Sequence, residues 1–202
     1  MSMVRIAFLF DYKSLLRRIT PVFKALEYGS SNELRKLAMD TGTNNPKIWK
    51  ILDYYGFYPK DDDFEEKNYD GVDGRVAFWL ILVMAEYCSI IDNPVDPKTI
   101  GEALRPAGID EETILMLAKG KPFSNIFLSL AQTISKDATI DNILGNIDDY
   151  PAGWLNIEDI KTLEAKLRVH REQINHPAFE RLQAMLDTAI QSRQGLILGV
   201  AI

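Results

Sequence analysis

Residues 4–10 have the sequence VRIAFLF, and residues 196–202 have the sequence LILGVAI. Both segments are rich in Val, Ile, Leu and Phe and are too short for a convincing helix, so each is predicted to form a buried strand. Each strand has unpaired backbone N–H and C=O groups, and pairing the two strands is the simplest way to satisfy both sets. The sequence therefore predicts a small sheet that joins the N-terminal and C-terminal strands.

Helix signals fill the chain between these two strands. Asp96, Asp110 and Asn156 each stand where a side-chain oxygen can cap the first turn of a helix. Pro177 is placed to open the last helix, because proline is tolerated in a first helical turn. The region between the terminal strands is therefore predicted to consist of helices joined by short loops.

Residues 76–91 contain a single charged residue, Glu86. A segment that is apolar nearly all round is typical of a helix covered by other helices, so this one is predicted to lie at the centre of the fold. No low-complexity linker interrupts the chain, and residues 1–202 are expected to form a single globular domain. The predicted fold class is α+β, predominantly helical.

The composition is that of an ordinary globular protein, with 202 residues of which 47% are hydrophobic and 26% charged. The net charge of −6 opposes binding to nucleic acid, which needs clustered Lys and Arg. The longest strongly apolar run, residues 76–85, is about half as long as a membrane helix requires. The single cysteine, Cys88, cannot close an intrachain disulfide. We expect a cytoplasmic protein that binds neither nucleic acid nor a membrane, and its oligomeric state stays open.

Residues with catalytic or metal-binding chemistry are few. His170 and His176 are the only histidines, their spacing does not place them on one helical face, and Cys88 has no paired cysteine. Cys88 lies among apolar residues without the electropositive surroundings that activate a thiol. No nucleophile elbow, dinucleotide turn or phosphate loop occurs in the sequence. We therefore expect no catalytic residue, no metal and no cofactor, although the sequence does not settle whether the protein is an enzyme.

An aromatic cluster is followed directly by an acidic run. The candidate binding residues of this segment are Tyr54, Tyr55, Tyr58, Asp61, Asp62 and Asp63. Aromatic side chains with polar tips beside charges are frequent at binding surfaces, although packing in the core is the more common role of such rings. Calcium binding is not expected here, because Ala77 stands where a calcium loop needs a bidentate Glu.

A second candidate surface contains Tyr150 and Trp154. Pro151 and Gly153 favour a turn that could expose both aromatic rings. Alternatively, Trp154 packs against the helix that follows it, as a hydrophobic staple. Both interpretations stay open from the sequence.

Residues 153–160, with the sequence GWLNIEDI, lead through Leu163 and Leu167 toward the closing residues 195–198. This third of the chain resembles the YfbM-like group of uncharacterised bacterial proteins, which share a similar helix start and a last helix that leads into a terminal strand. Residues 3–19 also look similar to the N-terminal strand and helix of that group. The resemblance implies an α+β fold and a bacterial cytoplasm, and it implies no catalytic residue.

These observations favour a non-catalytic protein-binding module of an immunity-type or regulatory kind, with another protein as its partner and residues 54–73 as its recognition surface. The alternative is a small-molecule binding domain, or an enzyme of unrecognised type, with a pocket between helices. Such pockets use residues that are scattered in the sequence and leave no local motif. A pocket of a few hundred Å³ with converging polar groups would favour this alternative.

Overall fold

The computed structural model describes residues 4–27, 32–44, 79–80, 82–122, 126 and 152–201. The chain divides into two compact units. The first unit comprises Met1–Asp11, Cys88–Pro122 and Pro151–Ile202, and the second comprises Tyr12–Tyr87 and Phe123–Tyr150. Within the described residues the fold is α+β and predominantly helical, as predicted. The single domain over residues 1–202 stays a prediction.

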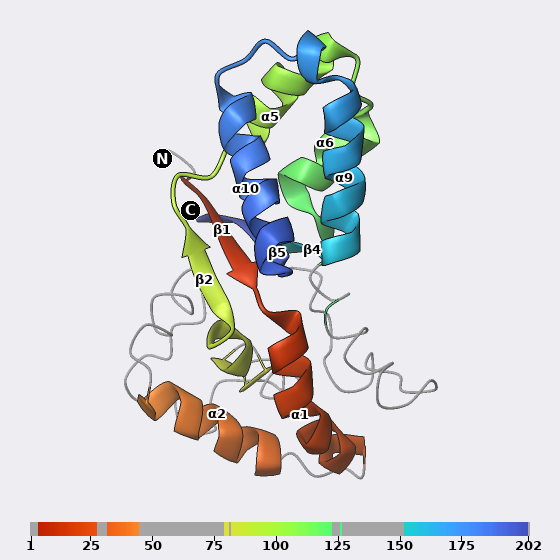
Figure 1. Cartoon of the computed structure of the whole chain (residues 1–202). Helices are drawn as coiled ribbons and strands as arrows, with labels where there is room; N and C mark the ends of the chain where they lie inside the picture. The colour runs from red at the N-terminus through yellow and green to blue at the C-terminus, as the bar shows by residue number, and fades with distance from the viewer. Residues whose placement is uncertain are drawn as a thin grey trace. The chain divides into compact units, whose positions relative to one another are not determined.

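The first unit is built on an antiparallel sheet with the strand order β2-β1-β5-β4-β3 (Figure 1). Its described strands are β1 (Val4–Phe10), β2 (Cys88–Ile91), β3 (Lys121–Pro122), β4 (Ala152–Leu155) and β5 (Gly195–Ala201). β1 pairs with β5 along its whole length, from Val4 opposite Ala201 to Phe10 opposite Gly195. The predicted pairing of the terminal strands is therefore confirmed. The three further strands were not expected from the sequence.

Both faces of the central strands carry buried side chains. On one face, Ala7 lies opposite Leu198, and both belong to the core cluster formed with the helices of the first unit. On the other face, Phe8 lies opposite Ile197, and both are at most 1% exposed. Strands buried on two faces have near-continuous apolar sequences, which is why neither segment shows polar and apolar residues in alternation.

Four α-helices of the first unit supply the rest of its described core. They are α5 (Pro97–Leu104), α6 (Glu111–Lys119), α9 (Ile157–Val169) and α10 (Ala178–Ser192), with the 3-10 turns η1 (Arg105–Ala107) and η3 (Arg171–Gln173). Asp96 caps α5, Asp110 caps α6, and Asn156 caps α9, as predicted. α10 starts directly after Pro177, as predicted. Local capping chemistry therefore sets where these helices begin.

A buried arginine ties the sheet to α6. Arg5 on β1 is 5% exposed, and its Nη2 donates a hydrogen bond of 3.0 Å to the carbonyl oxygen of Leu117. Leu117 lies in the last turn of α6, where carbonyl groups lack partners within the helix and the helix dipole is negative. The guanidinium charge is therefore placed where a helix end favours it.

The predicted central helix over residues 76–91 is wrong at its C-terminal end. Residues 82–85 are helical and buried, residues 86–87 form a turn, and Cys88–Ile91 form β2 beside β1. β1 has two sides that need backbone partners, and β5 satisfies only one of them. The β-branched Ile90 and Ile91 suit a strand, so pairing with β1 overrides the apolar pattern that predicted a helix.

The second unit begins with two helices, α1 (Tyr12–Glu27) and α2 (Asn32–Asn44), which pack against each other. Their described buried hydrophobic residues are Leu15, Ile19, Phe23, Leu34 and Ala38. Arg18 on α1 forms an ion pair with Glu86, and its Nη1 donates a hydrogen bond of 3.1 Å to the Tyr87 hydroxyl. This contact joins α1 to the end of the helical residues 82–85 within the second unit.

Replacement of Gly153 by alanine tests the close approach of β4 to the end of α6. A Cβ at position 153 would lie 1.6 Å from the carbonyl oxygen of Lys119, so the backbone has to move. We expect Gly153→Ala to lower the free energy of unfolding by about 3 kcal/mol, measured by urea titration. In the control Gly101→Ala, the new methyl meets only the far end of the Arg105 side chain, which is 57% exposed and can shift, so the change should stay within about 1 kcal/mol. Equal stabilities of the two variants would contradict the packing described here.

The helix caps predict an acid-dependent loss of stability. Hydrogen bonds from the hydroxyl and amide groups of Thr99 lower the pKa of Asp96, and bonds from the amide and hydroxyl groups of Thr113 lower the pKa of Asp110. A carboxylate with a lowered pKa in the folded state stabilises the protein above its unfolded pKa of about 3.9, and this stabilisation is lost as the pH falls through the folded value.

The double variant Asp96→Asn/Asp110→Asn keeps the capping oxygens but cannot titrate. Its melting temperature should therefore fall less between pH 5 and pH 2.5 than that of the wild type, measured by circular dichroism. The control is Asp187→Asn, since Asp187 lies inside α10 and caps no helix. A double variant with the wild-type pH profile would show that these caps do not couple to acid stability.

Candidate functional site

Most of the sequence-predicted binding residues lie outside the described residues. They are Tyr54, Tyr55, Tyr58, Asp61, Asp62, Asp63 and Tyr150. Trp154 is described: it lies in β4, pairs with Ile197 on β5 and is 4% exposed. Its side chain is therefore buried in a strand rather than displayed on an exposed turn. Of the two interpretations of Trp154, the structure therefore has a packed side chain and not an exposed one, while the recognition surface over residues 54–73 stays a prediction.

β2 is the outermost described strand on its side of the sheet, next to β1 (Figure 1). Ser89 and Ile90 are exposed, and the Ile90 side chain is 58% exposed. β2 contains neither a charged residue nor a proline, which are the features that commonly protect edge strands from pairing with other chains. Among the residues that the structure describes, no strand pairs with the outer side of β2, so this uncharged edge with an exposed isoleucine can accept a further strand.

The backbone conformation of the residues that follow β2 ends the strand. Asn93 has a φ of 50°, a left-handed conformation that asparagine tolerates better than most residues. Pro94 follows it and has no backbone N–H to continue a ladder. The chain therefore turns away from the sheet at residues 92–94 and leads into α5.

A hollow of about 310 Å³ lies between this turn and α10. Its apolar lining comes from Ile91 and Pro94 on one side and from Ala184 and Met185 on the other. Ile91 lies opposite Ala7, which belongs to the face of the sheet that packs on the helices. The hollow therefore adjoins the helix-covered side of β2, and we call it the edge hollow.

The rim of the edge hollow carries one charge of each sign. Arg181 lies on the α10 side, and its Nη1 donates a hydrogen bond of 3.2 Å to Oδ1 of Asn93. Asp92 lies on the β2 side. Within the described residues, neither Arg181 nor Asp92 forms an ion pair with the other or with a further side chain. The guanidinium group thus keeps donors for a ligand.

A second hollow, of about 460 Å³, lies at the connection between α9 and α10. Arg171 and Glu180 line it together with His176, whose Nδ1 accepts a hydrogen bond of 3.1 Å from the amide of Ala178. His176 therefore caps the start of α10 with its ring nitrogen. Arg171 and Glu180 are exposed.

The described residues include a single cysteine, Cys88, whose surroundings do not activate its thiol. Burial raises the pKa of the Cys88 thiol well above its ordinary value, which keeps it protonated and a poor nucleophile. In the described part of the chain, no three side chains of the His, Cys, Asp and Glu types gather in a way that could hold a metal ion. None of the described helices has the length and apolar character needed to cross a membrane.

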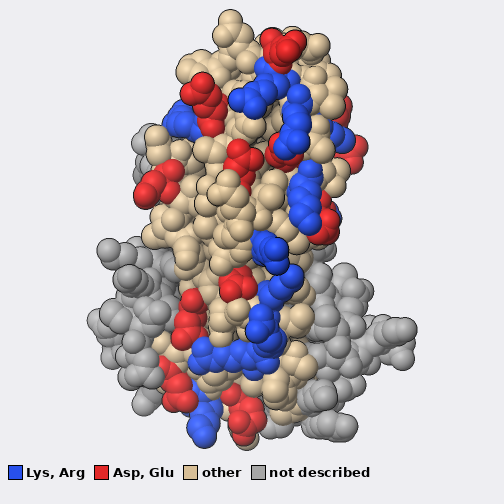
Figure 2. All heavy atoms as spheres, viewed as in Figure 1, with Lys and Arg blue, Asp and Glu red and all other residues tan. Residues whose placement is uncertain are grey.

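The basic residues of α9 lie among acidic ones. Figure 2 shows blue and red side chains interspersed over the upper part of the view, where α9 and α10 lie. Lys161 pairs with Glu158 at 2.8 Å, and Arg168 pairs with Glu164 at 2.8 Å. The side chains of Lys161 and Arg168 are exposed, so this part of α9 is a solvated surface of mixed charge rather than a concentrated basic patch.

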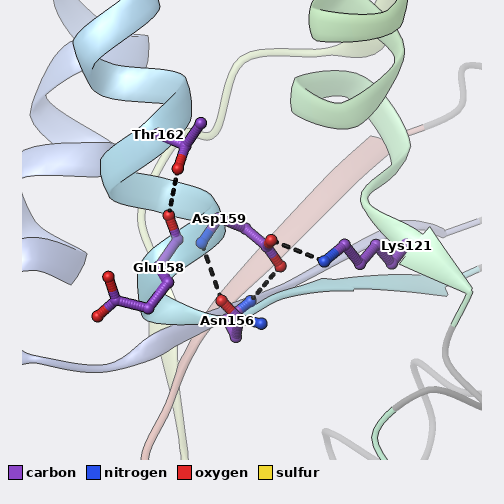
Figure 3. A network of polar contacts seen from close by, with 5 residues as sticks. All are labelled: Lys121, Asn156, Glu158, Asp159 and Thr162. Atoms are coloured by element: carbon purple, nitrogen blue, oxygen red, sulfur yellow. Dashed lines mark hydrogen bonds and ion pairs between the residues drawn. The ribbon is translucent and has the colours of Figure 1, made fainter.

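A polar network fixes the start of α9 beside β3 (Figure 3). The side chain of Asn156 accepts a hydrogen bond from the amide of Asp159, and the Asp159 carboxylate accepts one from the amide of Asn156. The other oxygen of Asp159 pairs with Nζ of Lys121 at 2.7 Å. This capping box supplies hydrogen-bond partners for the first turn of α9, and the ion pair with Lys121 connects α9 to β3. We assign the network a structural role.

Comparisons with known proteins find no matching family model, no matching curated protein and no matching solved structure. The resemblance to the YfbM-like group therefore stays a prediction.

Substitutions in the capping network test its structural role. We expect Asp159→Ala to lower the free energy of unfolding by about 1–2 kcal/mol, because α9 loses a capping partner and Lys121 loses its carboxylate. Lys121→Met should cost at most about 1 kcal/mol, since its side chain is 38% exposed. The control is Glu158→Ala in the same helical turn, where the side chain is 74% exposed and the cost should stay below about 0.5 kcal/mol. Urea titration measures all three, and similar losses for Asp159 and Glu158 would refute the assignment.

Proposed function

We propose that this protein is a non-catalytic binding module that recognises another protein, as immunity-type and regulatory partners do. The observation that carries the proposal is the β2 edge, which has an exposed Ile90 and no charged residue. In an antiparallel ladder, alternate residues of a strand direct both backbone groups toward one neighbour, and the residues between them direct theirs outward. β2 therefore offers backbone donors and acceptors to an added strand.

Strand addition is a common mode of protein recognition, in which main-chain hydrogen bonds supply affinity and pockets for alternate side chains supply specificity. The structure contains both elements at one place, because Ile91 belongs to β2 and also lines the edge hollow. Burial raises the pKa of the Cys88 thiol of the same strand, which argues against a thiolate nucleophile there.

The alternative function is small-molecule binding. It is favoured by the second hollow, whose volume of about 460 Å³ falls in the range of ligand sites and whose lining includes the polar side chains of Arg171, His176 and Glu180. Those side chains come from one connection and the first turns of α10, so they surround a small ligand from one side only. The edge of β2 therefore supports the protein-binding function better.

The substitution Ile90→Lys tests the proposed function. A lysine at the centre of a four-residue edge strand places a charge where a partner strand would pack, as natural proteins do to block edge pairing. The proteins captured by the wild-type chain from lysate of its native host, with crosslinking, should be recovered at least about tenfold less by this variant, a loss of about 1.4 kcal/mol or more. Quantitative mass spectrometry of the captured proteins is the measurement.

The matched control is Leu115→Lys, which introduces the same charge at another exposed aliphatic residue. Leu115 lies on α6 and is 53% exposed, close to the 58% of Ile90. Both variants should keep the wild-type melting temperature, because neither side chain is buried. Equal recovery of partners by the two variants, or no specific partner for the wild type, would remove the support for the proposal.

A further inference from the structure

We infer that the segment bound at β2 is an extended stretch of a partner polypeptide with a large apolar residue and, two positions away, an acidic residue. The apolar side chain fills the edge hollow, and the carboxylate pairs with Arg181. This inference rests on the proposed function, because it specifies which partner chemistry the β2 edge accepts.

The position of the edge hollow relative to β2 determines which side chains of an added strand face it. A strand added beside β2 directs successive side chains to opposite faces of the sheet. One set continues the face of Ile90, and the other continues the face of Ile91. Since Ile91 lines the edge hollow, a side chain of the second set points toward it, with α10 as the facing wall.

The lining of the hollow selects an apolar side chain. Ile91, Pro94, Ala184 and Met185 supply carbon surface on both walls. The volume of about 310 Å³ is at the lower end of the range for small-molecule pockets, and it is large enough for one long aliphatic or aromatic side chain. A pocket beside an open edge strand is the arrangement that strand-addition domains use for specificity.

The charges at the rim select the acidic residue. Arg181 precedes Ala184 by about one turn of α10, a rise of about 4.5 Å along the helix. Side chains two positions apart on one face of a strand are about 6.6 Å apart, within reach of a long arginine side chain. An arginine guanidinium has five N–H donors, and Arg181 uses one on Asn93. Asp92 lines the hollow from the β2 side and repels a carboxylate. The acidic residue of the partner therefore lies nearer to Arg181 on α10 than to Asp92.

The experiment is a selection of displayed random ten-residue peptides on the full chain, followed by affinity measurements with the enriched peptides. The wild type should enrich peptides in which a large apolar residue and an Asp or Glu are two positions apart. Ile90→Lys should weaken the binding of these peptides at least about tenfold, and Leu115→Lys should not. Hydrogen exchange with a bound peptide should slow at residues 89–91.

Two further variants test the hollow separately from the edge. Ala184→Phe fills the hollow from the exposed surface of α10, so reselected peptides should carry a small residue in place of the large one. Arg181→Glu reverses the charge at the rim, so reselected peptides should exchange the acidic residue for Lys or Arg. The matched controls are Ala165→Phe on α9 and Arg171→Glu, both at exposed positions outside the edge hollow, and they should leave the selected sequences unchanged.

The outcomes separate the inference from the function on which it rests. If Ile90→Lys abolishes binding while Ala184→Phe and Arg181→Glu leave the selected sequences unchanged, the binding function stands and the apolar and acidic specificity is wrong. If Ile90→Lys has no effect, or no peptide is enriched, both are wrong. Concentration-dependent self-association in sedimentation, lost in Ile90→Lys, would assign the edge to a second copy of the chain and overturn the inferred partner.

Discussion

The pairing of β1 with β5 is the contact on which the first unit depends. Both strands carry buried side chains on their two faces, so any backbone group left without a partner would be cut off from water at a high cost. Seven residues of β1 lie opposite seven of β5, and each strand then has one further side free. β4 occupies the free side of β5, and β2 occupies that of β1.

The two edge strands of the sheet, β3 and β2, differ in how they contact their surroundings. At the β3 end, Gly153 allows a backbone approach that no other residue permits, and Lys121 connects the strand to the start of α9 through Asp159. At the β2 end, the strand has four residues, an exposed isoleucine and no charge. The β3 edge is held by contacts with α6 and α9, whereas the β2 edge has the features of a surface for strand pairing. This difference is the basis of the proposed function.

The helices matter to the proposed function because α10 forms one wall of the edge hollow. α10 begins where His176 caps it and ends at Arg193, whose left-handed conformation turns the chain into β5. Met185, Leu186 and Ala189 pack into the core, which sets the rotation of α10 and leaves Arg181, Ala184 and Thr188 beside the turn that follows β2. The orientation of Arg181 is thus a consequence of core packing on the adjacent face of the same helix, with Met185 at the boundary between the two faces.

The sequence by itself determined the features that depend on neighbouring residues. The terminal strands could be predicted because short runs of aliphatic residues need backbone partners, and Asp96, Asp110 and Asn156 could be predicted as helix caps because capping uses residues within one turn. The tertiary structure alone decided that Cys88–Ile91 forms a strand, that Trp154 is buried and that Arg181 reaches Asn93, 88 positions away in the chain. An apolar run is compatible with a helix or a strand until a partner is present, and a pocket between distant residues leaves no local pattern, so these features depend on contacts that only the folded chain contains.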